Sequence, residues 1–263
     1  MSEHLDMTTT LSATPVDGDP FIPDAYAGKS LPRESFANLA LAGADFRGSD
    51  LSMTDFRGAQ LANANFEGAD LSGAQFHGAD VRGALFTDAR LLYANFSDAR
   101  LDDAAFVRAF MHHADLSRAS AQSARFTWSR LMHATLRGAR CAGADFTGAC
   151  LRFADCRGAD LSYATLEFAD AATIKLVGAV LRDALLLGAN LDCASVAGAD
   201  FSGAILGRTV ITNCADLDRV AGLVTVSHVA PSALDVDTFR RLRETLPAAF
   251  FAGIGIHVEP SAP

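Results

Sequence analysis

Histidine and cysteine, two common ligands of zinc, gather in one part of this chain of 263 residues. They are His112, His113, His133 and Cys150. A closed zinc site needs four such ligands that converge on one point in a tetrahedron. The spacing here does not bring four ligands obviously together, and two imidazoles in equivalent positions more often stack on each other. We therefore expect no metal and no other cofactor.

Serine, histidine and aspartate are also plentiful, so nucleophilic and acid–base catalysis have to be considered. A catalytic site holds such groups at fixed geometry in a pocket that excludes water. The sequence has no G-x-S-x-G segment to present a nucleophilic serine, no G-x-x-x-x-G-K-[ST] loop for phosphates and no G-x-G-x-x-G segment for a dinucleotide. We therefore predict that the protein is not an enzyme.

The strongest regularity of the sequence concerns alanine, which recurs at every fifth position from Ala44 to Ala204. Two positions after most of these alanines stands Leu or Phe, which we call the centre of a five-residue unit. A period of five matches neither an α-helix nor a flat strand. It suits a square coil with one unit on each side, in which the alanine and the centre point inward. Only four of the 33 positions in the series carry another residue, namely Ser49, Thr54, Ser129 and Ile174.

The pattern A-(D/N)-(L/F)-x-x, as in ADFRG, ADLSG and ANFSD, resembles the pentapeptide-repeat family. This resemblance covers about 180 residues and implies an all-β solenoid, a right-handed quadrilateral β-helix. Centres from Phe36 to Ile211 make 36 units, hence about nine coils whose equivalent residues lie twenty apart. Two core columns are then predicted, Phe36, Phe56, Phe76 and Phe96 in one and Phe46, Phe66, Phe86, Phe106, Phe126 and Phe146 in the other.

The two ends of the chain depart from the repeat. Residues 1–30 are rich in Thr, Ser, Pro and Asp and lack the features of a signal peptide, so we predict a mostly disordered N-terminal arm. Residues 31–216 are the predicted β-helix. Residues 217–263 contain a helical pattern that starts at Asp235 or Asp237. This pattern predicts either a small helical cap on the last coil or a dimer contact. The side chains assigned to this cap or contact are Phe239, Leu242, Leu246, Phe250, Phe251 and Ile254.

Cysteine usage and hydropathy bear on the environment of the chain. The five cysteines show no paired spacing, and Cys141 and Cys156 fall on buried centre positions. This usage suits a reducing compartment, and we expect a cytoplasmic protein. No stretch approaches the ~20 apolar residues of a membrane span, so no membrane contact is expected.

One flank of the predicted solenoid departs from the small polar residues that fill most corners, two positions after each centre. Four neighbouring coils bring aromatic, methionine, histidine and arginine side chains together there, and such residues are enriched in protein interfaces. Three explanations are open. We favour a partner-binding patch over cover by the arm or the tail and over tolerated drift. The candidate residues are Arg90, Leu92, Tyr93, Arg108, Phe110, His112, His113, Arg118, Trp128, Arg130, Met132, His133, Arg152 and Phe153.

Charge helps to choose between two functions. Some pentapeptide-repeat proteins resemble B-form DNA in width and negative charge, bind DNA gyrase or topoisomerase IV, and protect it from quinolones. The formal net charge is −9, but residues 31–216 hold 21 acidic and 17 basic residues and contribute only −4. DNA carries one negative charge per ~1.7 Å of axis, so this rod is a poor electrostatic copy of it.

We therefore predict a non-enzymatic scaffold or adaptor that binds a protein partner, with the DNA-mimicking binder of DNA gyrase as the alternative. The acidic balance and the absence of a basic stripe argue against direct binding of nucleic acid. The tail leaves two oligomeric states open, a monomer or a homodimer.

Overall fold

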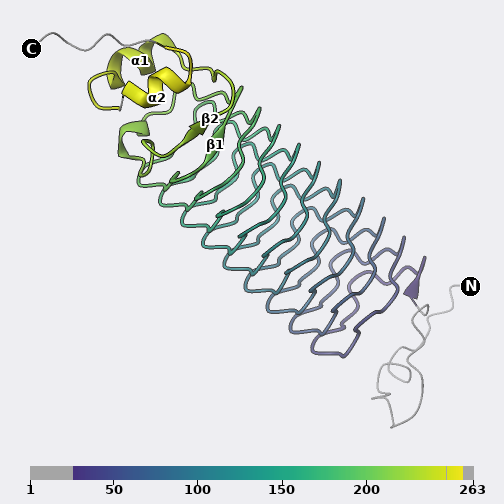
Figure 1. The fold of residues 1–263 in the computed structure, drawn as a ribbon. Coiled ribbons are helices and arrows are strands. Elements are labelled where there is room, and N and C mark those ends of the chain that lie inside the picture. The colour runs from purple at the N-terminus through teal and green to yellow at the C-terminus, as the bar shows by residue number, and fades with distance from the viewer. Residues whose placement is uncertain (1–25, 247, 257–263) are drawn as a thin grey trace, which may run out of the picture.

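The computed structural model describes residues 26–246 and 248–256, which form a rod of stacked square coils with a helical end (Figure 1). In each unit the centre accepts a backbone hydrogen bond from the alanine three residues later, as Leu91 does from Ala94 at 3.1 Å. This bond closes a β-turn, and the corner residue of the turn has a positive φ, 57° at Tyr93. One extended residue separates successive turns. It pairs in parallel with its equivalents twenty residues away, as Arg90 does with Phe110.

The pairing keeps an offset of twenty residues from Ser30 to Val210, which makes nine coils and confirms the predicted right-handed quadrilateral β-helix. The core starts earlier than the predicted first centre, Phe36. Tyr26 occupies a centre position, and its ring stacks on Phe46 with centroids 4.8 Å apart. Residues 26–30, which fall in the predicted arm, therefore belong to the first coil, and the rest of that arm lies outside the described residues.

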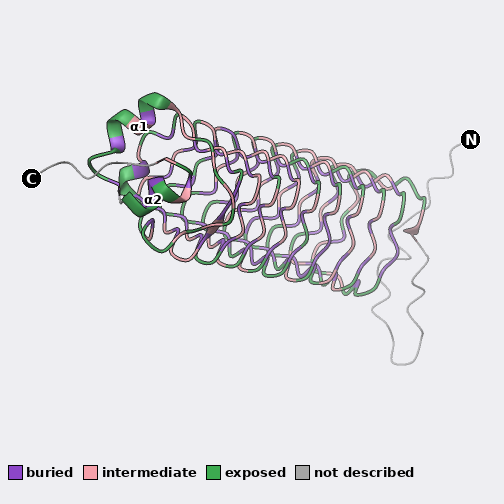
Figure 2. Cartoon of the chain, turned by 45° about the horizontal axis from the view of Figure 1, so that its top comes forward, coloured by how far each residue is buried: buried purple, intermediate pink, exposed green. Residues whose placement is uncertain are grey.

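Phenylalanine rings fill the core in the two predicted columns. Within a column, Phe86 stacks on Phe66 and Phe106 with centroids 4.8 Å apart in both cases. Across the core the columns meet edge to face, as Phe86 does with Phe76 at 5.9 Å and 89°. Figure 2 shows buried residues on the inside of the coils and exposed residues along their outer edges. Each ring touches only its own and the adjacent coils, so contacts between neighbouring coils supply most of the stability.

The last coil breaks the strict period because extra residues widen it. The pairing offset grows to 21 residues at Asp200 and to 23 at Val210. Between them, β1 (Ile205–Leu206) pairs in parallel with β2 (Ser227–His228) at an offset of 22. The 3₁₀ helix η2 (Leu217–Arg219) begins where the repeat falls out of step.

The tail folds over the end of the solenoid as two short helices, α1 (Val236–Leu242) and α2 (Ala248–Gly253) (Figure 1). The Asp235 carboxylate accepts a hydrogen bond from the Thr238 amide at 2.7 Å and caps the start of α1. The same carboxylate accepts the Asn213 amide at 2.8 Å, which ties α1 to the last coil. No helix among the described residues is long and apolar enough to cross a membrane.

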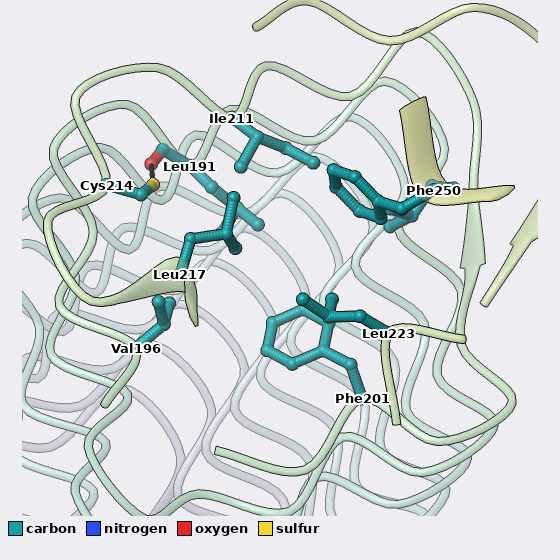
Figure 3. Close-up of a pocket in the computed structure, with 9 residues that line it drawn as sticks. Leu191, Val196, Phe201, Ile211, Cys214, Leu217, Leu223 and Phe250 are labelled. Atoms are coloured by element: carbon teal, nitrogen blue, oxygen red, sulfur yellow. Dashed lines mark hydrogen bonds between the residues drawn. The ribbon is translucent and has the colours of Figure 1, made fainter. Parts of the chain in front are cut away.

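The apolar side chains of the tail pack against the last coil. Phe250 lines a cavity of only 10 Å³ together with Phe201, Leu223 and other apolar residues of the solenoid end (Figure 3). Such a cavity is too small for a ligand. The tail therefore covers the open end of the solenoid within one chain, and a dimer contact stays a prediction. Of the six residues assigned to this region, Phe239 is partly buried, and Leu242, Leu246, Phe250, Phe251 and Ile254 are at most 7% exposed.

Candidate protein-binding surface

Four rings stack on the outer surface at one corner of the solenoid. We call Tyr93, His113, His133 and Phe153 the ring column. Successive centroids lie 5.0, 5.0 and 4.8 Å apart, and the planes differ by 2° to 8°. The first and last rings remain open to solvent, with Tyr93 63% and Phe153 42% exposed. The twenty-residue coil thus converts four distant residues into one continuous surface.

The backbone of the ring column is strained. Its four corner residues have φ between 57° and 59°, in the left-handed region. This conformation costs a residue with a β-carbon roughly 1–2 kcal/mol of conformational free energy, whereas it costs glycine almost nothing. Each stacking contact stabilises the column by about 0.5–1.5 kcal/mol. The three contacts together therefore offset part of the strain at the four corners. Gly73 occupies the same corner one coil earlier, which shows that the fold accepts glycine at this position.

Arginine side chains lie beside the ring column. The guanidinium of Arg130 sits 4.6 Å from the centre of the Phe110 ring, a cation–π contact on the adjoining side of the coil. The guanidinium of Arg152 lies 5.8 Å from the Phe153 ring and 3.4 Å from the Asp170 carboxylate. The flank therefore combines aromatic surface with positive charge.

Trp128 extends this surface at the neighbouring corner. Its indole ring covers the backbone of Gly148, where a β-carbon would collide with it, and the residue is 58% exposed. Phe168 occupies the same corner two coils further on, covers Gly188 in the same way and is 63% exposed. Phe168 was not predicted from the sequence, although its position forty residues after Trp128 marks the same corner. Tyr163, 66% exposed, lies at a different corner.

The structure places the remaining predicted residues less favourably for binding. Leu92, His112 and Met132 are half-buried in the turns before the ring column. Ion pairs already neutralise three arginines, and hydrogen bonds from Arg108 and Arg118 lower the pKa of Asp88 and Asp98. The pairs, each with an aspartate twenty residues earlier, are Arg90–Asp70 at 3.3 Å, Arg108–Asp88 at 2.5 Å and Arg118–Asp98 at 2.6 Å.

The electrostatic environment of the flank is positive. Burial, followed by the nearby charges of Arg130, His113 and His133, lowers the pKa of His112. Protonation of His112 is therefore disfavoured by neighbours of the same sign. Within the described parts of the chain, no three His, Cys, Asp or Glu side chains gather as a metal site.

The buried cysteines offer little chemistry. All five are free thiols. Cys141 and Cys156 are buried at centre positions as predicted, and burial raises the pKa of Cys141 to about 12. A thiol with so high a pKa is a poor nucleophile near neutral pH.

Comparison with known proteins adds family membership to this geometry. Among solved structures, the chain is similar to HetL, a pentapeptide repeat protein involved in heterocyst differentiation regulation from the cyanobacterium Nostoc sp. strain PCC 7120. The identity is 30%, over 67% of this chain and 86% of HetL, with a TM-score of 0.29. It is also similar to full-length QnrB1, a plasmid-mediated fluoroquinolone resistance protein, with 22% identity over 82% of this chain and 96% of QnrB1 and a TM-score of 0.24.

A comparison with curated protein sequences finds no match. The family model for pentapeptide repeats, in eight copies, matches residues 40–78, 49–88, 69–106, 99–138, 139–171 and 174–208. These segments together span more than half of the chain. The chain therefore belongs to the pentapeptide-repeat family.

Proposed function

We propose that this protein is a non-enzymatic scaffold that binds a protein partner through the flank formed by the ring column, Trp128 and the Arg130–Phe110 pair. The ring column carries the proposal, because it keeps four rings on the surface where glycine would be less strained. Contiguous exposed apolar groups of this kind mark interaction sites. Pentapeptide-repeat proteins are generally non-catalytic binding or structural proteins, which supports the same conclusion.

The interior of the solenoid supports a surface function as well. Alanine, leucine and phenylalanine fill the coils and are almost completely buried. Among the described residues, the filled interior offers no pocket large enough for a substrate, so recognition has to use the outside of the rod.

The proposal is tested by replacing Tyr93, Trp128 and Phe153 together with glycine. All three corners have a positive φ, so glycine fits the backbone and the fold should persist. We expect the triple variant to keep its circular dichroism spectrum and to lose its partner. Tyr163→Gly is the matched control, because Tyr163 is equally exposed at a corner with φ of 60° but lies off the flank.

The measurement is quantitative co-purification from cells, followed by the affinity of the identified partner for each purified variant. Partner binding that survives the triple change at wild-type affinity would sink the assignment of the flank. Loss of binding in Tyr163→Gly alone would place the interface at another corner.

A DNA-mimicking binder of DNA gyrase or topoisomerase IV is the second candidate, because some members of the family act in this way. The charge of this rod speaks against it, since the coils contribute only −4 of the net charge of −9. Such a mimic should lose affinity steeply with salt, whereas an apolar contact should be nearly insensitive. A gyrase supercoiling assay with and without a quinolone tests this function directly. The mimic would be favoured over the scaffold if a low concentration of the protein inhibits gyrase or protects it from the quinolone, and if the triple variant keeps this effect.

A further inference from the structure

Arginine is concentrated in the middle of the rod. Residues 104–157 contain eight arginines, three aspartates and neither lysine nor glutamate, although the whole chain has a net charge of −9. One coil, residues 121–140, contains four arginines and no acidic residue at all. An acidic protein therefore carries an excess of positive charge around the coils that hold the ring column, which corrects the expectation that basic residues are spread evenly along the rod. The arginines of this coil are Arg125, Arg130, Arg137 and Arg140.

The repeat explains why the four arginines of coil 121–140 form no ion pair. In other coils an aspartate just before the centre pairs with an arginine just after it, as Asp155 does with Arg157 at 2.5 Å. In coil 121–140 the residue just before the centre is arginine in three units and Thr135 in the fourth, where an aspartate would otherwise stand. Arg137, which follows the centre of that fourth unit, therefore has no aspartate beside it. Among the described residues, none of the four arginines of this coil forms an ion pair.

Arg130 brings this uncompensated charge onto the flank. The Phe110 ring covers one side of its guanidinium at 4.6 Å, which positions the group while its N–H donors stay available for a carboxylate. Arg130 is exposed, so a ligand in solution can reach it.

The ring column points to the same kind of ligand. Its rings already stack face to face at 4.8–5.0 Å, so only the outer faces of the two end rings, Tyr93 and Phe153, are left for a nucleobase. The edges of the rings point away from the stack, and aromatic edges carry partial positive charge. The imidazoles of His113 and His133 add N–H donors at these edges. Carboxylates complement such a surface, whereas cations do not.

We propose that the partner docks on this flank through an acidic peptide segment. Aspartate or glutamate side chains of that segment bind Arg130 and the edges of the ring column, and an apolar side chain contacts Trp128. This inference rests on the proposed binding function of the flank and names the chemistry of its partner. The column is about 15 Å long, which matches four or five residues of extended chain.

The test uses the full chain and a short fluorescent peptide of alternating glutamate and phenylalanine. Two matched peptides carry glutamine or lysine in place of glutamate. Binding is followed by the anisotropy of the peptide and by the fluorescence of Trp128, the single tryptophan of the chain. We expect only the acidic peptide to bind, with an affinity that falls as salt is raised, since screening weakens exposed charge contacts.

Variants locate the contact. Arg130→Gln removes the charge but keeps much of the side chain, and we expect it to weaken binding of the acidic peptide roughly tenfold. Arg182→Gln is the control, because Arg182 pairs with Asp200 at 2.6 Å near a different corner. It should leave the affinity unchanged.

Each other outcome has a definite reading. Equal binding of the glutamine peptide, lost in Trp128→Gly, overturns the acidic partner but leaves the binding function of the flank intact. Binding of the acidic peptide that survives glycine at Tyr93, Trp128 and Phe153 shows that the flank is not the site, and both proposals fail.

The last part of the test concerns the N-terminal arm, because residues 1–25 contain five acidic residues and neither lysine nor arginine. A full-chain variant replaces these five acids by amides. Binding of the acidic peptide to this variant alone would show that the chain covers its own flank, which overturns an external partner. The five changes are Glu3→Gln, Asp6→Asn, Asp17→Asn, Asp19→Asn and Asp24→Asn.

Discussion

Replacing Phe86 with alanine removes one ring from the middle of a core column, and the structure sets the size of the effect. Phe86 is fully buried. It stacks on Phe66 and Phe106 at 4.8 Å. It also meets Phe76 and Phe96 edge to face at 5.9 and 5.7 Å. Phe→Ala changes in protein cores cost about 3–5 kcal/mol, and with ring contacts on four sides we expect the upper half of that range.

The coupling between rings gives a sharper test, because each ring touches only adjacent coils. Phe86 and Phe106 are in contact, so their double replacement should show a coupling energy of about 0.5–1.5 kcal/mol. Phe126 lies about 10 Å from Phe86, with Phe106 between them. The costs of replacing Phe86 and Phe126 should therefore add to within about 0.5 kcal/mol.

Denaturant unfolding of the single and double alanine variants, followed by circular dichroism, measures these energies. Hydrogen exchange shows whether the coils open together, which decides whether a two-state analysis applies. Equal coupling in both pairs, or none between Phe86 and Phe106, would refute a core built from contacts between adjacent coils.

Three further changes test the cap and the acid stability of the rod. Gly253→Ala would place a β-carbon in steric clash with the ring of His228, so the cap should open more often. Faster amide hydrogen exchange in α2 would measure this opening. Asp235→Ala removes the acceptor of the Thr238 amide and should lower the free energy of unfolding by about 1–2 kcal/mol, measured with denaturant. Hydrogen bonds from the Ser202 side chain and amide lower the pKa of Asp200 from 3.8 to about 2. The ionised Asp200 therefore contributes its full stabilisation above pH 3.8, the ordinary pKa, and loses it as the pH falls toward 2. Asp200→Asn should remove this part of the acid-induced fall in melting temperature.

Neighbouring residues supply the controls for the cap. Ala252→Ser changes an exposed position beside Gly253 and should leave amide exchange unaltered. Asp237→Ala removes a carboxylate that is 92% exposed in α1 and should have a much smaller effect than Asp235→Ala. An exchange rate in Gly253→Ala equal to that of the wild type would contradict the contact with His228. Equal losses at the two aspartates would show that Asp235 does not act as a helix cap.

The repeat made the fold predictable from the residues, because an alanine and a large apolar residue at a period of five leave one way to bury both. The helical cap was predictable too, since Asp235 precedes a helical pattern of apolar residues. The widened last coil was not predictable, because the extra residues that lengthen the pairing offset from 20 to 21, 22 and 23 follow no period. Tyr26 was not recognised as a centre, because it lies in the N-terminal segment rich in Thr, Ser, Pro and Asp. Phe168 was not predicted, because Gly148 separates it from Trp128 at the same corner.

By itself, the sequence determined the cross-section of the rod, the residues of its core and the corner at which the ring column lies. Only the tertiary structure decided how the surface charges are shared. Arg57 pairs with Asp55 two residues before it, whereas Arg108 pairs with Asp88 on the previous coil. Both choices are compatible with the repeat, because a long side chain at a turn reaches its own coil and the next one. The contacts across neighbouring coils select between them. Arg130 is unpaired for a different reason, because its coil contains no acidic residue and its neighbours on the adjacent coils are Phe110 and Cys150.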